Sequence, residues 1–410
     1  MRVLTLVSTF PPGYTGGAEI SALNTCRGLM RAGVECVILV MNNRTTAQDE
    51  WYEVSGIPVH RVGLLTPVRM HLTDVFDWRV YRAVRRELRH FRPDLVHMHN
   101  ASGSTLAPYV ACRSLGVPVV NTLHDLWLLC PNNMLYRPDG SLCTLRRVGK
   151  VCQTCFRRYD FWGAIPHRRA VFAALTSNVK LFISPSQAVI DRHVEAGHAA
   201  RRFRLVRLGF EEPRGAQTEE QMDWAPERGG PHKTIAYAGG GIEIKGAAVL
   251  GQALPAMLRH IEGLNVLIAG TGEEHFLAEF KKYAPAVRLL GRLSPEMTRS
   301  LFAAADLTVV PSICHENSPV VIYESYQVGT PVLGSAIGGI PELIDEQKTG
   351  YLFPVGDAAT LASQAILHFG RPARERRRIR HQCIAAAHER LTFQRHLQGV
   401  LDVYQEALSG

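Results

Sequence analysis

Short apolar runs alternate with longer amphipathic segments along the first half of the chain. The apolar runs are rich in β-branched residues and predict buried strands; they lie at residues 2–8, 34–41, 93–100, 117–123 and 181–184. The segments between them are longer, and residues 18–32 carry apolar side chains at helical spacing. Strands separated by helices pair in parallel through right-handed crossovers. The pattern therefore predicts an α/β fold with a doubly wound sheet.

The same alternation starts again after a polar stretch at residues 211–231. The second series of predicted strands lies at residues 234–238, 264–269, 287–290, 307–312 and 329–334. At 410 residues, a prior of about 150 residues per domain suggests two or three domains. We therefore expect a first domain at 1–212, a linker at 213–231 and a second domain at 232–390. Residues 391–410 have helical spacing and are a candidate to cross back to the first domain.

Glycines and polar residues follow the predicted strands, where doubly wound sheets bind ligands. In the first domain Gly16, Gly17, His99 and the pair His124-Asp125 lie along one rim. His97 and His99 point to the same side of their strand, and a structural role is as plausible for them as a ligand contact. In the second domain, glycine turns follow three strands, and backbone amides in such turns can meet a pyrophosphate; they are Gly239-Gly240-Gly241, Gly270-Thr-Gly272 and Gly291-Arg292.

Two glutamates, Glu316 and Glu324, flank the predicted start of a helix. Ser318 or Asn317 is expected to cap this helix, and Pro319 suits its first turn. Helix N-termini collect anions, and an unpaired buried carboxylate is costly, so both acids are expected to serve a polar ligand. The alternative is a loop acid and an exposed helical acid.

The order of motifs around these glutamates resembles the donor half of retaining glycosyltransferases of family 4. The matching run is Glu316, seven residues, Glu324, then Gly329-Thr-Pro-Val, Gly338-Gly-Ile-Pro-Glu342 and Thr349-Gly-Tyr-Leu-Phe-Pro-Val-Gly-Asp357. The resemblance implies a GT-B fold, in which two doubly wound Rossmann-like domains face a central cleft.

The resemblance also implies roles for individual residues. Lys245 would hold the donor diphosphate, Glu324 the ribose hydroxyls, and Glu316 and His124 the transferred sugar. Glu316, His124 and Lys245 are thus the candidate catalytic residues, and His99 and Asp125 are placed on the acceptor side. The other candidate donor-binding positions are Gly16, Gly17, Gly240, Gly241, Gly270, Gly272, Arg292, Asn317, Ser318, Pro319 and Val320.

One position departs from the family pattern. The family commonly has Gly-Arg before the lysine, and this chain has Gly239-Gly240. Either Arg292, Lys233 or another basic group replaces the missing guanidinium, or donor binding is weaker than usual.

The net charge of +9 includes two arginine-rich stretches, at residues 79–92 and 371–380. The first has the spacing of a basic amphipathic helix, which either lies on an anionic membrane or is solvated. Nothing resembles a nucleic-acid module. No apolar run reaches the ~18 residues of a membrane span, and the N-terminus lacks the apolar region of a signal peptide. We expect a cytoplasmic protein, with the inner face of the plasma membrane as a candidate location.

Four of the nine cysteines cluster in a predicted insertion at about residues 126–160. Cys130, Cys143, Cys152 and Cys155 end in a Cys-x-x-Cys pair, which is the usual half of a structural zinc site. Unligated thiols are the main alternative, and an iron cluster or a disulfide is a further one. Catalysis itself requires no cofactor in this scheme.

The predicted activity is retaining transfer of a sugar from a UDP- or GDP-linked donor to an acceptor hydroxyl. We expect a saccharide or lipid-linked acceptor, in cell-surface polysaccharide or glycolipid synthesis. The alternatives are a nucleotide-sugar-binding protein without catalysis and a GT-B epimerase. A double-displacement hydrolase fits the two glutamates less well. The sequence does not specify the sugar, the base, the acceptor or the oligomeric state.

Overall fold

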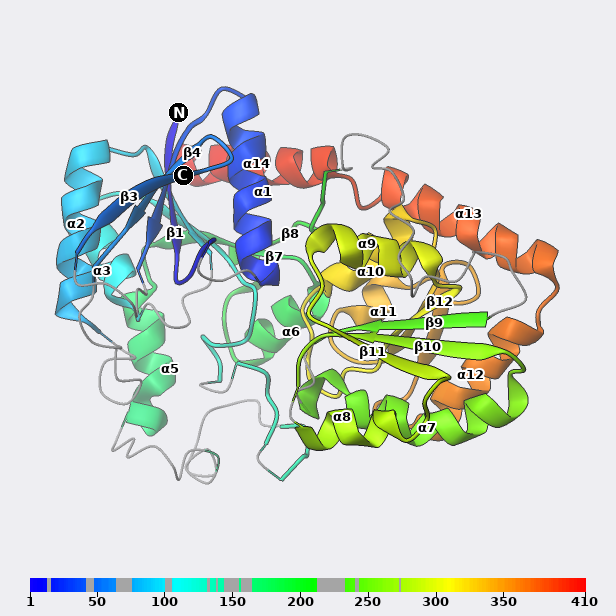
Figure 1. Ribbon diagram of the computed structural model, residues 1–410. Coiled ribbons are helices and arrows are strands. Elements are labelled where there is room, and N and C mark those ends of the chain that lie inside the picture. Colours follow the sequence, from blue (N-terminus) through cyan, green and yellow to red (C-terminus); the bar gives the residue numbers. More distant parts are fainter. Residues whose placement is uncertain are drawn as a thin grey trace. The chain divides into compact units, whose positions relative to one another are not determined.

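The computed structural model forms two compact units, each built around its own sheet (Figure 1). Unit 1 comprises Met1–Gly209 and Phe393–Gly410, and unit 2 comprises Phe210–Thr392. The structure describes residues 1–12, 16–41, 48–63, 76–99, 105–130, 133–137, 139–143, 155, 164–211, 233–239, 243–272 and 274–410. The predicted fold class, two α/β domains with parallel sheets, is confirmed.

The sheet of unit 1 has eight strands in the order β3-β4-β2-β1-β5-β6-β7-β8. The strands are β1 (Arg2–Val7), β2 (Glu35–Val40), β3 (Glu50–Val54), β4 (Ile57–Arg61), β5 (Leu95–His99), β6 (Val119–Thr122), β7 (Val179–Ser184) and β8 (Phe203–Leu205). All neighbours are parallel except β3 and β4. From β1 the chain moves first to β2 on one side and later to β5 on the other. The switch point between β1 and β5 is where such sheets bind ligands.

The β3–β4 hairpin was not predicted. Every residue of β3 is exposed or half-buried, so this strand lacks a clear apolar alternation, and β4 contains Pro58. Proline lacks a backbone donor, so an apolar run that contains it is expected to form an edge strand or no strand. The hairpin forms the edge of the sheet, where these features are tolerated.

The helices of unit 1 include one from the far end of the chain. They are α1 (Gly17–Arg31), α2 (Trp78–Phe91), α3 (Ala107–Ser114), α5 (Ala164–Leu175), α6 (Gln187–Glu195) and α14 (Phe393–Ser409), with the short turn η1 (Ala200–Arg202). Val400, Val403 and Tyr404 of α14 are buried in one core cluster with Leu95 and Val120 of the central strands. The C-terminal helix is therefore part of the core of unit 1.

The sheet of unit 2 has six parallel strands in the order β11-β10-β9-β12-β13-β14. They are β9 (Lys233–Ala238), β10 (Leu264–Ala269), β11 (Val287–Gly291), β12 (Leu307–Val310), β13 (Val332–Ser335) and β14 (Gly350–Phe353). The helical elements are η2 (Glu243–Lys245), α7 (Ala247–His260), α8 (Glu274–Lys281), α9 (Pro295–Ala304), α10 (Val320–Gln327), α11 (Ile340–Leu343), α12 (Ala358–Gly370) and α13 (Ala373–Glu389). The switch point lies between β9 and β12.

Candidate functional site

Lys245 and Glu316 meet at the switch point of unit 2. Lys245 ends η2, which follows β9, and Glu316 lies in the loop after the neighbouring strand β12. The Lys245 ammonium Nζ lies 2.6 Å from Oε1 of Glu316, although 71 residues separate the two along the chain. The Glu316 side chain is 14% exposed and that of Lys245 is 37% exposed. The two residues predicted for the diphosphate and the sugar thus form one accessible ion pair.

Ser312 and Gly339 hold Glu316 in place. The buried Ser312 hydroxyl donates a 2.9 Å hydrogen bond to Oε1 of Glu316. The backbone N–H of Gly339 donates to the Glu316 carbonyl at 2.8 Å. A side chain at Gly338 would place its Cβ 2.2 Å from that same carbonyl oxygen. The Gly338-Gly339 pair therefore lets the backbone pack closely against the loop that carries Glu316.

The helix α10, which starts between the two glutamates and contains Glu324, begins without a side-chain cap. Its N-cap residue is Pro319 and its first residue is Val320. The prediction that Ser318 or Asn317 caps it is wrong: the N-cap is Pro319, and the Ser318 hydroxyl lies 2.6 Å from the Tyr323 hydroxyl instead. The first N–H groups of any helix have no acceptor within the helix. This N-terminus, 4 residues after Glu316, can accept an anion.

Glu324 differs from Glu316 in having no counter-charge. Burial raises the pKa of the Glu324 carboxyl to about 7. No residue in the described part of unit 2 forms a hydrogen bond or ion pair with this carboxyl. A desolvated carboxyl without a partner is costly, and such groups concentrate at binding sites.

The glycine turns after β9, β10 and β11 line one edge of the sheet. The N–H of Gly239 donates to the carbonyl of Ala269, and the N–H of Gly270 donates to that of Gly291. Gly270 has a φ of +131°, and a Cβ there would lie 1.8 Å from the carbonyl oxygen of Gly239. Gly272 is exposed at this edge, whereas Gly240 and Gly241 lie outside the described residues.

The two proposed replacements for the missing arginine lie at opposite ends of the sheet. Arg292 directly follows β11 and is exposed at the carboxyl edge. Lys233 is the first residue of β9, roughly 16 Å along the strand from its carboxyl end at the usual strand rise. Lys233 is therefore excluded as the replacement, and Arg292 remains a candidate.

In unit 1, Gly16 and Gly17 begin α1 beside a buried acid. The N–H of Gly16 donates to Oε2 of Glu19 at 3.0 Å, and the Thr9 hydroxyl donates to Oε1 at 2.7 Å. Glu19 is only 8% exposed. It fixes the point where the loop after β1 enters α1, in the manner of a capping box. Glu19 three residues after Gly16 is a signal for this role that the sequence analysis overlooked.

His124 follows β6 and is partly exposed, whereas His99 at the end of β5 is buried. His99 Nδ1 lies 3.0 Å from His124 Nε2, and its Nε2 lies 3.2 Å from Nδ1 of His97. Both nitrogens of His99 are thus hydrogen-bonded to histidines of unit 1, and its place on the acceptor side stays a prediction. One Asp125 oxygen accepts the N–H of Trp127 at 2.9 Å, which forms the turn after His124.

The described residues give no support for the predicted zinc site. Cys130 and Cys143 are half-buried against the core of unit 1, Cys155 is also half-buried, and Cys152 lies outside the described residues. No three His, Cys, Asp or Glu side chains of the described chain lie close enough together to hold a metal ion. Zinc stays a prediction.

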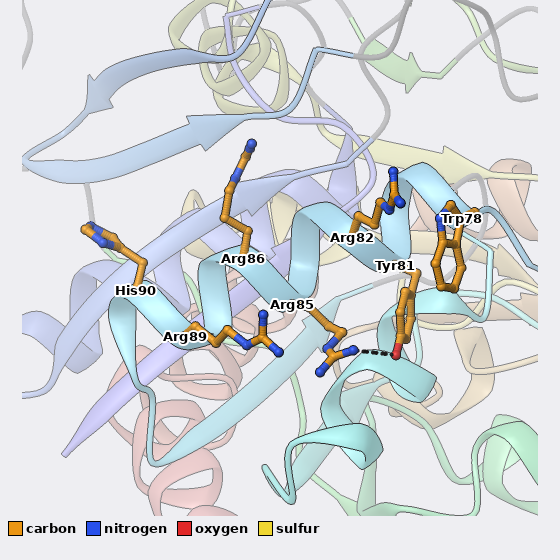
Figure 2. A pocket seen from close by; sticks show the side chains of 7 residues that line it. All are labelled: Trp78, Tyr81, Arg82, Arg85, Arg86, Arg89 and His90. Carbon is orange, nitrogen blue, oxygen red and sulfur yellow. Dashed lines mark hydrogen bonds between the residues drawn. The ribbon is translucent and has the colours of Figure 1, made fainter.

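The exposed face of α2 forms a basic and aromatic surface in unit 1 (Figure 2). Trp78 is 54% exposed, and its ring stacks on that of Tyr81 with 4.8 Å between centroids. Arginine side chains continue along the same face, and together these residues line a cavity of about 490 Å³; they are Arg82, Arg85, Arg86 and Arg89, followed by His90. In the described part of the chain, no helix is both long and apolar enough to cross a bilayer.

Two family profiles match this chain. Residues 15–212 match the family described as Glycosyltransferase Family 4, and residues 232–369 match the one described as Glycosyl transferases group 1. Together they cover most of both units.

Several characterised proteins are similar in sequence. A phosphatidyl-myo-inositol mannosyltransferase of Mycobacterium leprae is 28% identical over 45% of this chain, and the alignment spans 51% of its own length. The chain thus spans about half the length of this relative. A D-inositol 3-phosphate glycosyltransferase of Segniliparus rotundus is 25% identical over 97% of this chain and 86% of its own length.

Solved structures share the fold. The Anabaena protein HepE, crystallised with UDP-glucose, superposes with a TM-score of 0.70 at 19% identity and covers 99% of both chains. Sucrose-phosphate synthase from Thermosynechococcus elongatus gives a TM-score of 0.72 at 17% identity, over 100% of this chain and 99% of its own. The similarity to these two structures confirms the predicted GT-B fold.

Proposed function

We propose an activity for this chain from the premise that it belongs to glycosyltransferase family 4, the group 1 glycosyl transferases. The chain transfers a sugar from a UDP- or GDP-linked donor to an acceptor hydroxyl with retention of configuration. The named relatives use inositol-containing acceptors, which supports a saccharide or lipid-linked acceptor. The setting we propose is cell-surface polysaccharide or glycolipid synthesis.

The Lys245–Glu316 pair is the observation that carries this proposal. An ammonium and a carboxylate lie 2.6 Å apart at a topological switch point, beside the uncapped N-terminus of α10. An incoming diphosphate offers Lys245 more negative charge than one carboxylate does. The diphosphate would therefore replace Glu316 as the partner of the Lys245 ammonium. The Glu316 carboxylate could then bind hydroxyls of the sugar.

The reaction requires stabilisation of a departing diphosphate. The bond between the anomeric carbon and the β-phosphate oxygen breaks, and its electron pair goes to that oxygen. The acceptor oxygen bonds to the anomeric carbon on the same face, and its proton passes to the departing phosphate. Lys245 and the α10 dipole stabilise the developing negative charge, an effect commonly worth a few kcal/mol.

Removal of the Lys245 ammonium tests the assignment. In Lys245→Ala we expect kcat/KM for transfer from the accepted donor to fall on the order of 100-fold, as for loss of one preorganised charge. The donor is identified with a panel of UDP- and GDP-sugars. Lys233→Ala is the matched control, because it removes the same charge from the opposite end of β9.

The outcome separates this activity from its alternatives. Equal activity of Lys245→Ala and Lys233→Ala would overturn the role of Lys245. Tight nucleotide binding by the wild type without turnover of any donor would favour a non-catalytic binding protein. Formation of product from UDP-N-acetylglucosamine without an acceptor would favour an epimerase.

We further propose that the basic face of α2 rests on an anionic membrane, at the inner face of the plasma membrane. Its arginines attract anionic headgroups, and the exposed Trp78 suits the bilayer interface. Arg86 is already paired with Asp49, so Arg82, Arg85 and Arg89 are the cations to remove. Each basic residue near such a surface is worth about 1 kcal/mol.

Vesicle sedimentation tests this surface. We expect the Arg82→Gln/Arg85→Gln/Arg89→Gln variant to lose most of its binding to phosphatidylglycerol-containing vesicles. The matched control is Arg374→Gln/Arg377→Gln/Arg378→Gln, which removes three exposed arginines from α13. Equal binding by both variants would refute the assignment to α2.

The cysteine insertion is tested by metal analysis. We propose that a structural zinc, bound by Cys152 and the other three clustered cysteines, stabilises the insertion at about residues 126–160. The purified protein should then contain one zinc per chain, lost in Cys155→Ser and kept in the control Cys112→Ser, whose thiol lies buried in the core. A metal-free wild type with four titratable thiols in the insertion would end the proposal.

A further inference from the structure

A chain of four buried or half-buried polar side chains leads from the C-terminal helix to His124. The Tyr404 hydroxyl of α14 lies 2.6 Å from His97 Nδ1. His97 continues to His99 and His99 to His124, at 3.2 and 3.0 Å. The other nitrogen of His97 lies 2.7 Å from the Thr122 hydroxyl. All of these residues belong to unit 1.

Each of the three imidazoles is neutral. Burial lowers the pKa of His97 to about 3 and that of His124 to about 4, and it lowers the pKa of His99 well below its ordinary value. A neutral imidazole carries one N–H and one unprotonated nitrogen. Once one ring's tautomer is set, the neighbouring ring's tautomer follows.

Tyr404 sets the first tautomer. Its side chain is fully buried, and in the described chain its hydroxyl has one hydrogen-bond partner, Nδ1 of His97. A buried hydroxyl that donates no hydrogen bond destabilises the folded state. The phenol therefore donates its proton, and Nδ1 of His97 accepts it. The proton of His97 is then on Nε2, from which it is donated to the Thr122 hydroxyl oxygen.

The other two rings follow from this assignment. His99 Nε2 faces the unprotonated Nδ1 of His97, so it must carry a proton, since two lone pairs would otherwise repel at 3.2 Å. His99 Nδ1 is then unprotonated and accepts from the Nε2–H of His124. The remaining nitrogen of His124, Nδ1, carries a lone pair. No described residue of unit 1 forms a hydrogen bond with it.

We infer that Tyr404 is a positioning residue that, through His97 and His99, holds His124 in the Nε2–H tautomer, so that Nδ1 accepts a hydrogen bond from a hydroxyl of the donor sugar. This inference rests on the proposed role of His124 as a contact to that sugar. It gives the C-terminal helix, 280 residues from His124 in the sequence, a share in the donor site. It also predicts selectivity for a sugar that has a hydroxyl at the contacted position over its deoxy counterpart.

Histidine nitrogen NMR tests the tautomer directly. The protein is labelled with ¹⁵N-histidine, and long-range proton–nitrogen correlations at pH 7 report which nitrogen of each ring is protonated. The His124 signals are assigned by their absence from His124→Gln. We expect the wild type to show His124 as a single Nε2–H tautomer.

Tyr404→Phe removes the phenol proton donor and keeps the ring. We expect His124 to become a mixture of tautomers and kcat/KM for transfer to fall about tenfold, the loss of one hydrogen bond's free energy. Tyr109→Phe is the matched control. Its hydroxyl is equally buried in unit 1 and donates to Oδ1 of Asn121 at 2.7 Å, outside this network. It should leave the His124 signals unchanged.

Failure of this inference differs from failure of the proposed function. A wild type without transferase activity would overturn the proposed function, and the tautomer would still be measured. A wild-type His124 that carries its proton on Nδ1, or that is already a mixture, would overturn the inference even if Tyr404→Phe did not fold. An unchanged His124 tautomer in a folded Tyr404→Phe would do so as well.

Discussion

Two glutamates eight positions apart have opposite surroundings in this protein. Glu316 is neutralised by Lys245 and receives a hydrogen bond from Ser312. Glu324 has neither, and burial raises its pKa to about 7. In the proposed enzyme the two carboxylates therefore have different roles. Ribose hydroxyls supply the hydrogen-bond donors that Glu324 lacks. Glu316 becomes available to the sugar only when the diphosphate binds Lys245.

The desolvated carboxyl of Glu324 predicts that the stability of the folded state depends on pH. The pKa of Glu324 is about 7 when folded and 4.5 ordinarily, so the folded protein binds this proton more tightly. The stability of the folded state therefore falls as the pH rises from about 4.5 through 7, by at most about 3 kcal/mol. Glu324→Gln should remove this fall, and the free energy of unfolding in urea from pH 5 to 8 measures it.

The control for this prediction is Glu346→Gln, which removes an exposed carboxyl from the same unit and should not alter the pH profile. Glu324→Gln should also bind the nucleotide more weakly while gaining stability above pH 7. If the variant and the wild type had parallel stability profiles, the carboxyl would not be desolvated in solution.

At the scale of secondary-structure elements, the start of α7 determines where Lys245 lies. Gly246 follows Lys245 directly and has a φ of +73°. A Cβ at this position would lie 1.8 Å from the carbonyl oxygen of Pro311, which follows β12. The end of η2 is thus packed against the loop that carries Glu316, and this packing brings the ammonium to the carboxylate.

Substitution of Gly246 should therefore cost more than backbone strain alone. Gly356 has a similar φ of +76°, but a Cβ there meets nothing within 4 Å. We expect Gly356→Ala to lower the free energy of unfolding by about 1 kcal/mol and Gly246→Ala by about 3 kcal/mol or more. Chemical denaturation measures both, and nucleotide binding should weaken only in Gly246→Ala. Equal losses in the two variants would show that the Pro311 contact is absent.

At the scale of the whole molecule, the chain's last helix completes the core of its first unit. Val400, Val403 and Ala407 of α14 pack on residues of the central strands, such as Leu95 and Val120. The Thr25 hydroxyl and the Arg207 carbonyl add hydrogen bonds to the His396 ring at 2.9 Å each. The first unit is therefore incomplete until the C-terminus has folded onto it.

A cavity in α14 should destabilise unit 1 specifically. Val403 is 3% exposed and Leu408 is 44% exposed on the same helix. We expect Val403→Ala to lower the free energy of unfolding by about 1–3 kcal/mol and Leu408→Ala by less than about 0.5 kcal/mol. Hydrogen exchange should locate the loss of protection from Val403→Ala in the strands of unit 1. A loss confined to unit 2 would contradict this packing.

Much of the architecture is readable from local sequence patterns. Strands such as β1, β9 and β10 were predicted within about one residue, because buried parallel strands are continuous apolar runs whose ends are marked by glycine or polar residues. The β3–β4 hairpin was not, because β3 has no buried residue and therefore carries little periodic signal. The cap of α10 was also mispredicted, since Ser318 bonds with Tyr323 instead.

The α/β class, the two series of strands and the glutamates on either side of a helix start can be read from the amino-acid sequence, because each depends on residues close together in the chain. The pairing of Lys245 with Glu316 and the contact of Tyr404 with His97 became visible only in the folded chain. These contacts join residues 71 and 307 positions apart. They depend on the order of strands in the sheets and on the unit to which α14 returns, and no local pattern of apolar and polar residues encodes either.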